Sequence, residues 1–220
     1  LAHEITKIFP AIVDSEQKRI LMADEKKEAI KKLELQTKAF ENIAYTEIIE
    51  QIVAKQKAKS KLPTWYTAEK IVYPSKVSVE QTSSEKTAAY KSSLFEGNSL
   101  IDLSGGFGID DYYFAKNFKT VIHCEINDDL SKIVAHNYKQ LKIANIECLV
   151  GNSTDILRQL NQNFDCIYVD PSRRNDIKGK VFMLKDCEPN VPDLLDLYFE
   201  FSFKIIIKTA PILDIHAGLS

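Results

Sequence analysis

Hydrophobic positions recur with a helical period in the first sixty residues of the chain. Apolar side chains stand three and four residues apart, for example at Ile48, Ile49, Ile52 and Val53. This spacing predicts amphipathic helices, and no glycine interrupts the pattern before Gly97. Because Pro63 restricts the backbone of the residue before it, we expect the helical run to stop there. Residues 64–79 are then predicted to be a connector, after which Ser84 is a candidate cap for a further helix.

A different pattern begins at residue 99, where short apolar runs alternate with amphipathic segments. The apolar runs predict five strands, at 99–104, 118–126, 146–150, 164–170 and 204–211. The segments between them predict four helices, at 110–117, 129–142, 153–160 and 192–201. Such alternation indicates a doubly wound, Rossmann-like α/β fold, in which helices cover both faces of a parallel sheet. We therefore expect an N-terminal helical domain and connector over 1–75, and the α/β domain over 76–220.

The composition is that of a globular protein. The chain has 220 residues, of which 45% are hydrophobic. No apolar run approaches the roughly 18 residues that a membrane span needs, and no secretory signal is recognisable, so we expect no membrane partner. The four cysteines form no CxxC pair, so we expect no zinc, and no other metal is indicated. Buried free thiols are the favoured interpretation, and they fit a reducing cytoplasm.

The net charge of −2 conceals two basic segments. Residues 55–91 hold eight lysines and three glutamates, and residues 173–185 hold five basic residues and one aspartate. The rest of the chain is therefore acidic. Local basic patches on an acidic protein favour a polyanionic partner such as nucleic acid, with solvated lysines as the alternative.

Glycines follow a carboxylate at the end of the first predicted strand. Asp102 precedes Gly105, Gly106 and Gly108. In an open parallel sheet, ligands bind beyond the carboxyl ends of the strands, and glycines there let a ligand approach the backbone and permit positive φ. The free N–H groups of the next helix point towards the same place. The alternative is a glycine turn in some other α/β protein.

The spacing of these glycines distinguishes two classes of cofactor. Dinucleotides require GxGxxG, so that the pyrophosphate rests on the helix N-terminus. Here the frame that starts at Gly106 ends in Asp110 and Asp111, where a third glycine would stand, and these acids would repel a pyrophosphate. S-adenosylmethionine has no phosphate and carries an ammonium and a sulfonium. We therefore expect S-adenosylmethionine, and not NAD, to bind at Asp102, Ser104, Gly105, Gly106 and Gly108.

The ends of the next two predicted strands supply further polar groups. Glu125 ends the second strand, 23 residues after Asp102, where a carboxylate can accept both ribose hydroxyls. We assign the next residue, Ile126, to the same cofactor site. The segment after the third strand holds three residues that can contact the edge of the adenine ring, and the choice among them stays open. They are Asn152, Ser153 and Asp155.

The fourth strand ends in a polar residue followed by proline, where base methyltransferases bring the substrate to the methyl group. The predicted catalytic motif is Asp170, Pro171, Ser172 and Arg173. Methyl transfer is an in-line displacement, so the protein mainly positions the reactants. Asp170 can accept a hydrogen bond from an amine nucleophile and stabilise the developing cation. Arg173 and Arg174 can clamp phosphates, or else form a solvated loop.

Four segments together resemble the bacterial class I methyltransferases that carry a THUMP-like domain. They are EQTSSEKTAAYK (80–91), LIDLSGGFGID (100–110), YVDPSRR (168–174) and KGKVFMLKDCEPNVPDLL (178–195). The resemblance implies a Rossmann-like methyltransferase with S-adenosylmethionine and further C-terminal domains, so we expect a sheet truncated at its C-terminal end. It assigns Gln81, Ser84 and Thr87 to a segment that closes over the methionine end of the cofactor. Because THUMP domains are associated with tRNA modification, it also implies methylation of a base nitrogen in tRNA or rRNA.

One departure leaves the target atom open. Enzymes that methylate exocyclic base nitrogens usually carry an aromatic residue after the proline, where this chain has Ser172 and Arg173. Methylation of pyrimidine C5 needs a cysteine nucleophile, but the fifth strand ends in KTAP, and only Cys187 lies in a predicted loop. Carbon methylation is therefore disfavoured.

Two further alternatives stay open at this point. Trp65 and Tyr66, beside several lysines, can form a patch that stacks on RNA bases, or they can dock the helical domain onto the α/β domain. The chain can also be a small-molecule or protein methyltransferase, or a non-catalytic RNA-binding module with a vestigial cofactor pocket. The sequence does not indicate the oligomeric state.

Overall fold

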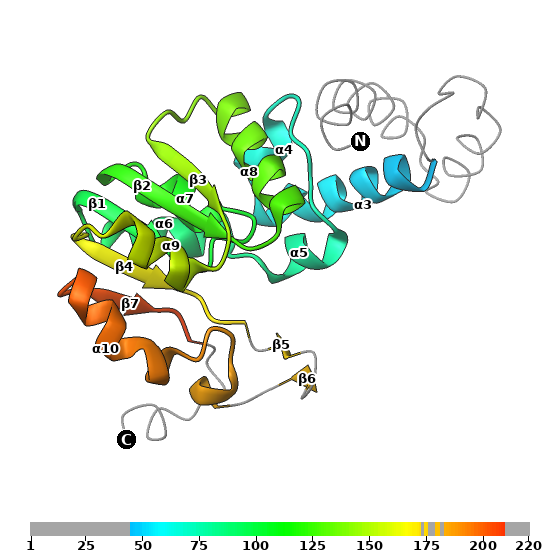
Figure 1. Cartoon of the computed structure of the whole chain (residues 1–220). Coiled ribbons are helices and arrows are strands. Elements are labelled where there is room, and N and C mark those ends of the chain that lie inside the picture. Colours follow the sequence, from blue (N-terminus) through cyan, green and yellow to red (C-terminus); the bar gives the residue numbers. More distant parts are fainter. Residues whose placement is uncertain (1–44, 173, 176–178, 181–182, 210–220) are drawn as a thin grey trace.

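A five-stranded parallel sheet forms the centre of the protein, in the order β3-β2-β1-β4-β7 (Figure 1). The computed structural model describes residues 45–172, 174–175, 179–180 and 183–209. All four strand pairs are parallel. The strands are β1 (Gly97–Asp102), β2 (Phe118–Glu125), β3 (Ile146–Val150), β4 (Cys166–Val169) and β7 (Ile205–Ile207). The predicted doubly wound α/β fold is confirmed, with β1 at its centre.

The predicted helices between the strands are also present. They are α7 (Ile109–Phe114), α8 (Asp128–Gln140), α9 (Ser153–Leu160) and α10 (Val191–Phe201). Before the sheet come α3 (Tyr45–Lys61), α4 (Pro63–Thr67), α5 (Lys76–Gln81) and α6 (Glu85–Ser93). A short 3-10 helix, η1 (Leu184–Asp186), and the antiparallel pair β5 (Arg174–Asn175) and β6 (Gly179–Lys180) follow β4.

The predicted connector over 64–79 is wrong in part, because α4 occupies its beginning and α5 its end. Pro63 does end the long helix α3, but it also opens α4 at the first helical turn. Proline is tolerated there because the first N–H groups of a helix have no intrahelical partner. Pro63 therefore marks both the end of α3 and the start of α4, and the sequence prediction gives only the end.

Alternate residues of each strand pack on opposite faces of the sheet. Ile101, Ile122 and Ile167 lie in one hydrophobic cluster with residues of α9 and α10. Leu100 and Tyr168 lie in another with Phe114 of α7. This two-sided burial explains why the strands read as continuous apolar runs.

The helices before the sheet share a hydrophobic core with it. Leu62, Trp65 and Tyr73 belong to the same buried cluster as Phe107 and Tyr138. Trp65 is fully buried, and its ring lies 4.7 Å from that of Tyr112 on α7. The docking interpretation of Trp65 is therefore correct, and a stacking role of this side chain on RNA is wrong. The boundary between residues 75 and 76 stays a prediction, and residues 1–44 of that domain lie outside the described part.

All four cysteines are free thiols. Cys124, Cys166 and Cys187 are buried, whereas Cys148 is half-buried. Burial raises the pKa of Cys148 and of Cys166 to about 12, and raises that of Cys124 as well. Within the ranges that the structure describes, no helix has the length and apolar character to cross a bilayer.

Candidate functional site

Three polar side chains stand side by side at the carboxyl end of the central strands. Asp102, at the end of β1, is in register with His123 of β2 and Tyr168 of β4. All three are nearly or completely buried. The α7 helix places two further carboxylates, those of Asp110 and Asp111, close to them. A buried polar layer therefore lies where ligands bind in sheets of this kind.

The glycine loop after β1 has the conformation that the sequence predicts. Gly106 and Gly108 have φ of 54° and 72°, in the left-handed region that favours glycine. A Cβ atom on Gly108 would lie 2.1 Å from the hydroxyl of Tyr138, so packing also requires this glycine. A Cβ atom on Gly106 would meet nothing closer than a backbone oxygen at 3.7 Å. The space on the Cβ side of Gly106 is therefore unfilled by atoms of the described residues.

Asp102 fixes the start of this loop. Its Oδ1 accepts hydrogen bonds from the backbone N–H of Ser104 at 2.7 Å and from the Ser104 hydroxyl at 2.9 Å. Burial, and then the nearby Asp111 carboxyl group, raise the pKa of Asp102. The Ser104 Oγ also accepts from the backbone N–H of Asp170 at 2.6 Å. Ser104 thus connects the glycine loop to the predicted catalytic motif.

Glu125 is attached to the same loop. Its Oε2 accepts from the backbone N–H of Gly106 at 3.0 Å, and its Oε1 accepts from that of Asn127 at 2.8 Å. A carboxylate has about four acceptor positions, so both oxygens can still accept hydroxyl hydrogens. The next side chain, Ile126, is 72% exposed. An exposed isoleucine beside a half-exposed carboxylate offers an apolar and a polar surface together.

The predicted adenine residues lie at the start of α9. Asn152 is the N-cap of this helix, and its Oδ1 accepts from the backbone N–H groups of Thr154 and Asp155. Ser153 is the first helical residue, and the exposed Asp155 lies 3.8 Å from Arg158. The choice among the three for adenine stays open. Capping occupies the side-chain oxygen of Asn152 but not its amide hydrogens.

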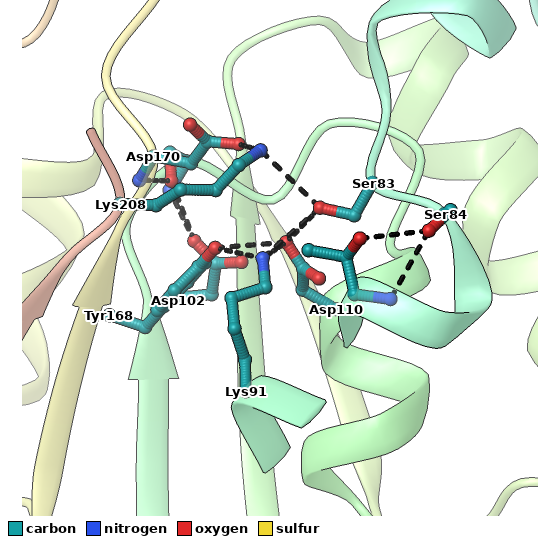
Figure 2. A network of polar contacts seen from close by, with 10 residues as sticks. Ser83, Ser84, Lys91, Asp102, Asp110, Tyr168, Asp170 and Lys208 are labelled. Carbon is teal, nitrogen blue, oxygen red and sulfur yellow. Dashed lines mark hydrogen bonds and ion pairs between the residues drawn. The ribbon is translucent and has the colours of Figure 1, made fainter. Parts of the chain in front are cut away.

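Asp110 belongs to a polar network that the sequence did not reveal (Figure 2). Its Oδ2 accepts from Lys91 at 2.5 Å, from the Tyr168 hydroxyl at 2.9 Å and from the Ser83 hydroxyl at 2.9 Å. Lys91 also donates to the Tyr168 hydroxyl and to Ser83. Burial lowers the pKa of Lys91, and Asp110 opposes this shift. The ion pair joins α6 to α7, and the hydrogen bonds to Tyr168 join both helices to β4.

Asp111 is also turned inward. Its Oδ2 lies 2.7 Å from Nδ1 of His123, and both side chains are fully buried. Burial raises the pKa of Asp111 and lowers that of His123. The expectation that Asp110 and Asp111 would repel a pyrophosphate therefore needs correction, because Asp111 is buried and Asp110 is neutralised by Lys91.

The predicted catalytic motif follows β4. Asp170 forms an ion pair with Lys208, whose Nζ lies 2.5 Å from its Oδ2 (Figure 2). Pro171 is buried. Ser172 is exposed and pairs through its backbone with Glu188. Arg173 lies outside the described residues. Cys187, the loop cysteine, is buried and its thiol donates to the carbonyl of Met183.

The residues predicted to close over the cofactor are Gln81, Ser84 and Thr87, and their neighbour Ser83 contacts the polar network around Asp110. Ser84 is the N-cap of α6, as the sequence predicts, and its Oγ accepts from the backbone N–H of Thr87. Ser84 and Thr87 contact each other, whereas Ser83 reaches Asp110 in the polar network. Gln81 is the last residue of α5. Of these side chains, the structure thus directs Ser83 to the site rather than Ser84.

The architecture is that of the Rossmann-like methyltransferases. A candidate methyltransferase of Porphyromonas gingivalis W83 is similar, with a TM-score of 0.70 and 30% identity. The similarity covers 81% of this chain and 45% of that protein, so the chain spans less than half its length.

Two other solved structures are less similar. The precorrin 8W decarboxylase of Methanobacterium thermoautotrophicum has a TM-score of 0.48 and 12% identity, and the similarity covers 63% of this chain and 68% of that one. A candidate RNA methyltransferase of Pyrococcus horikoshii has a TM-score of 0.45 and 19% identity, and the similarity covers 70% of this chain and 75% of that one. No family model matches the chain, and no curated protein gives a significant match. Membership of the THUMP-like family therefore stays a prediction.

Proposed function

We propose that this chain is the cofactor-binding and catalytic core of an S-adenosylmethionine-dependent methyltransferase that acts on a base nitrogen of RNA in the cytoplasm. The observation that carries the proposal is the arrangement of Asp102 and Glu125 around a glycine loop at the carboxyl edge of the sheet. The methyltransferase fold of the chain supports it.

The residues present fit this cofactor. The open side of Gly106 admits a ligand against the backbone, and Glu125 has acceptor positions for two ribose hydroxyls. Ile126 offers its exposed side chain to the adenine ring. The Oδ1 of Asp110 is buried and has no partner among the described residues, so it can accept from a cationic amino group. S-adenosylmethionine supplies a methyl group on an activated sulfonium.

The protein's own contribution is then binding and orientation. Ser104 holds the backbone of Asp170 against the cofactor loop, so a nucleophile bonded to Asp170 lies beside that loop. Lys91 donates to Ser83, Asp110 and Tyr168, so this network holds α6 and α7 against the sheet. Asp170 accepts the hydrogen bond of the nucleophile and holds its proton.

The case for RNA rests on the basic segments and on the THUMP-like resemblance. Part of the charge over 55–91 already has partners within the protein. Lys57 forms a surface ion pair with Glu80, Lys61 donates to the carbonyls of Val79 and Glu80, and the largely buried Lys91 pairs with Asp110. Lys59 and Lys86 are exposed and remain available to a polyanion. A small-molecule substrate is the alternative that this pairing favours.

We expect calorimetry to detect binding of S-adenosylmethionine or S-adenosylhomocysteine and no binding of NAD. The physical reason is that the glycine frame from Gly106 carries Asp111 where a dinucleotide site needs its third glycine for close packing of the helix on the strand. Binding of NAD with no response to either sulfur compound would contradict the proposed cofactor.

Glu125→Ala should weaken S-adenosylhomocysteine binding by about 1.5–3 kcal/mol, the range for hydrogen bonds to a charged group. Glu125→Gln is the matched control, because an amide oxygen can still accept from the loop N–H of Gly106 while one acceptor is lost. Isothermal titration of the folded variants checks the result. An unchanged dissociation constant in Glu125→Ala would exclude Glu125 from the ribose site.

Mass spectrometry of RNA nucleosides from cells with and without the gene tests the substrate class. Loss of one methylated nucleoside in the mutant cells is the expected result. Unchanged RNA modification, together with intact cofactor binding by the protein, would favour the small-molecule alternative.

A further inference from the structure

Two lysines of the site differ in how many of their hydrogens are already used. Lys91 donates to Ser83, Asp110 and Tyr168, which accounts for all three N–H groups of an ammonium, and its side chain is 13% exposed. Lys208 donates to Asp170 and Ser83 within the described residues, and its side chain is 28% exposed. Lys208 therefore keeps a donor at the edge of the site, whereas Lys91 does not.

Backbone pairing fixes Lys208 beside Asp170. Lys208 directly follows β7, and its backbone N–H donates to the carbonyl of Val169 at 2.9 Å, which continues the pairing of β4 with β7. The Asp170 side chain is 35% exposed. A carboxylate acceptor and an ammonium donor thus stand together at the carboxyl edge of two neighbouring strands, as Figure 2 shows.

We propose that Asp170 and Lys208 together bind a nucleobase edge in which a ring N–H stands beside a carbonyl, so that the methyl acceptor is a ring nitrogen. This inference rests on the proposed function and specifies its target atom. Guanine (N1–H and O6) and uracil (N3–H and O4) present such an edge. Asp170 accepts from the ring N–H, and Lys208 donates to the carbonyl oxygen.

The charges of the pair favour this class of nucleophile over an exocyclic amine. A neutral amine becomes positively charged as it is methylated, and an ammonium at the same acceptor opposes that charge. A ring nitrogen beside a carbonyl instead loses its proton, and the negative charge spreads to the carbonyl oxygen. Lys208 stabilises that oxygen. The exposed Ser172 after Pro171 also offers no aromatic ring for an exocyclic-amine substrate.

Methyl transfer to such a ring nitrogen replaces its N–H bond with an N–C bond. The proton of the ring N–H passes to Asp170, and the nitrogen electron pair forms the bond to the methyl carbon. The bond between that carbon and the cofactor sulfur breaks, and its electron pair stays on sulfur, which becomes a neutral thioether. Asp170 later returns its proton to solvent.

The product identifies the nucleophile directly. The full-length protein is incubated with labelled S-adenosylmethionine and total RNA from cells that lack the gene, and the labelled nucleosides are identified by mass spectrometry. Label in 1-methylguanosine or 3-methyluridine is the expected result. Label in an exocyclic-amine product, such as N6-methyladenosine, would overturn the inference and leave the proposed function intact. Unlabelled RNA would instead overturn the proposed function.

A second measurement tests Lys208 itself. Lys208→Met should lower single-turnover transfer about 10²–10³-fold near neutral pH, the loss typical of one oxyanion donor. The loss should shrink as the pH rises, because the base then deprotonates without the ammonium. Lys208→Arg should restore part of the rate, and Lys204→Met, at the opposite end of β7, is the matched control. A loss of the same size at every pH, without rescue by arginine, would overturn the substrate contact.

Discussion

Asp170→Asn should lower methyl transfer by about 10²–10⁴-fold, the usual contribution of a general acid or base, while S-adenosylhomocysteine still binds almost normally. The amide keeps the size of the side chain but cannot hold the proton of the nucleophile. The backbone contact of Asp170 with Ser104 does not depend on the side chain, so the cofactor loop keeps its position. The rate should therefore suffer much more than the ground-state complex.

Single-turnover transfer to total RNA by the full-length protein, with cofactor affinity measured in parallel, checks this expectation. Asp196→Asn is a suitable control, because it removes the same charge from an exposed position on α10. Near-normal turnover of the Asp170 variant would remove the motif from the active site.

Gly108→Ala should lower the free energy of unfolding by about 2–4 kcal/mol and the Tm by about 5–15 °C. A left-handed alanine is strained, and its Cβ would overlap the hydroxyl of Tyr138. That hydroxyl cannot move away easily, because Tyr138 is buried and donates to the carbonyl of Gly108 at 2.8 Å. The cost of overpacking thus adds to the backbone strain.

Gly106→Ala is the matched comparison. Its φ is also positive, but the space around its Cβ position is open, so only the backbone strain, about 1 kcal/mol, is expected. The same Cβ should obstruct cofactor binding. Thermal unfolding and calorimetry of both variants check the pair. Equal stability losses, with unchanged cofactor affinity in Gly106→Ala, would mean that the open side of the loop is not the cofactor surface.

Most of the fold could be predicted from the sequence because its signals are local. The alternation of apolar strands with amphipathic helices lies within windows of about ten residues. The positive φ of Gly106 and Gly108 and the cap at Ser84 were predicted on the same basis. The carboxyl ends of parallel strands meet at one edge, so the placement of Asp102 and Glu125 followed from the strand assignment.

The polar network could not be predicted because its members are far apart in the chain. Lys91 is 19 residues from Asp110 and 77 from Tyr168, and Lys208 is 125 from Ser83. From the sequence alone, a lysine such as Lys91 near the end of a polar helix cannot be distinguished from a solvent-exposed surface lysine. The KTAP segment shows a lysine but gives no sign that this lysine pairs with Asp170 on the neighbouring strand. The burial of Trp65 likewise depends on α7, which follows it by more than forty residues.

Two buried cysteines of the central strands allow opening of the core to be followed by thiol labelling. Cys124 and Cys166 lie on β2 and β4, on either side of β1, and burial keeps both thiols protonated. A protonated, enclosed thiol reacts with neither oxidants nor alkylating reagents, because the thiolate is the reactive form. Modification of either one requires its buried side chain to become exposed. The rate at which a thiol reagent labels these two cysteines therefore reports on opening of the packed core around the sheet, without any introduced probe.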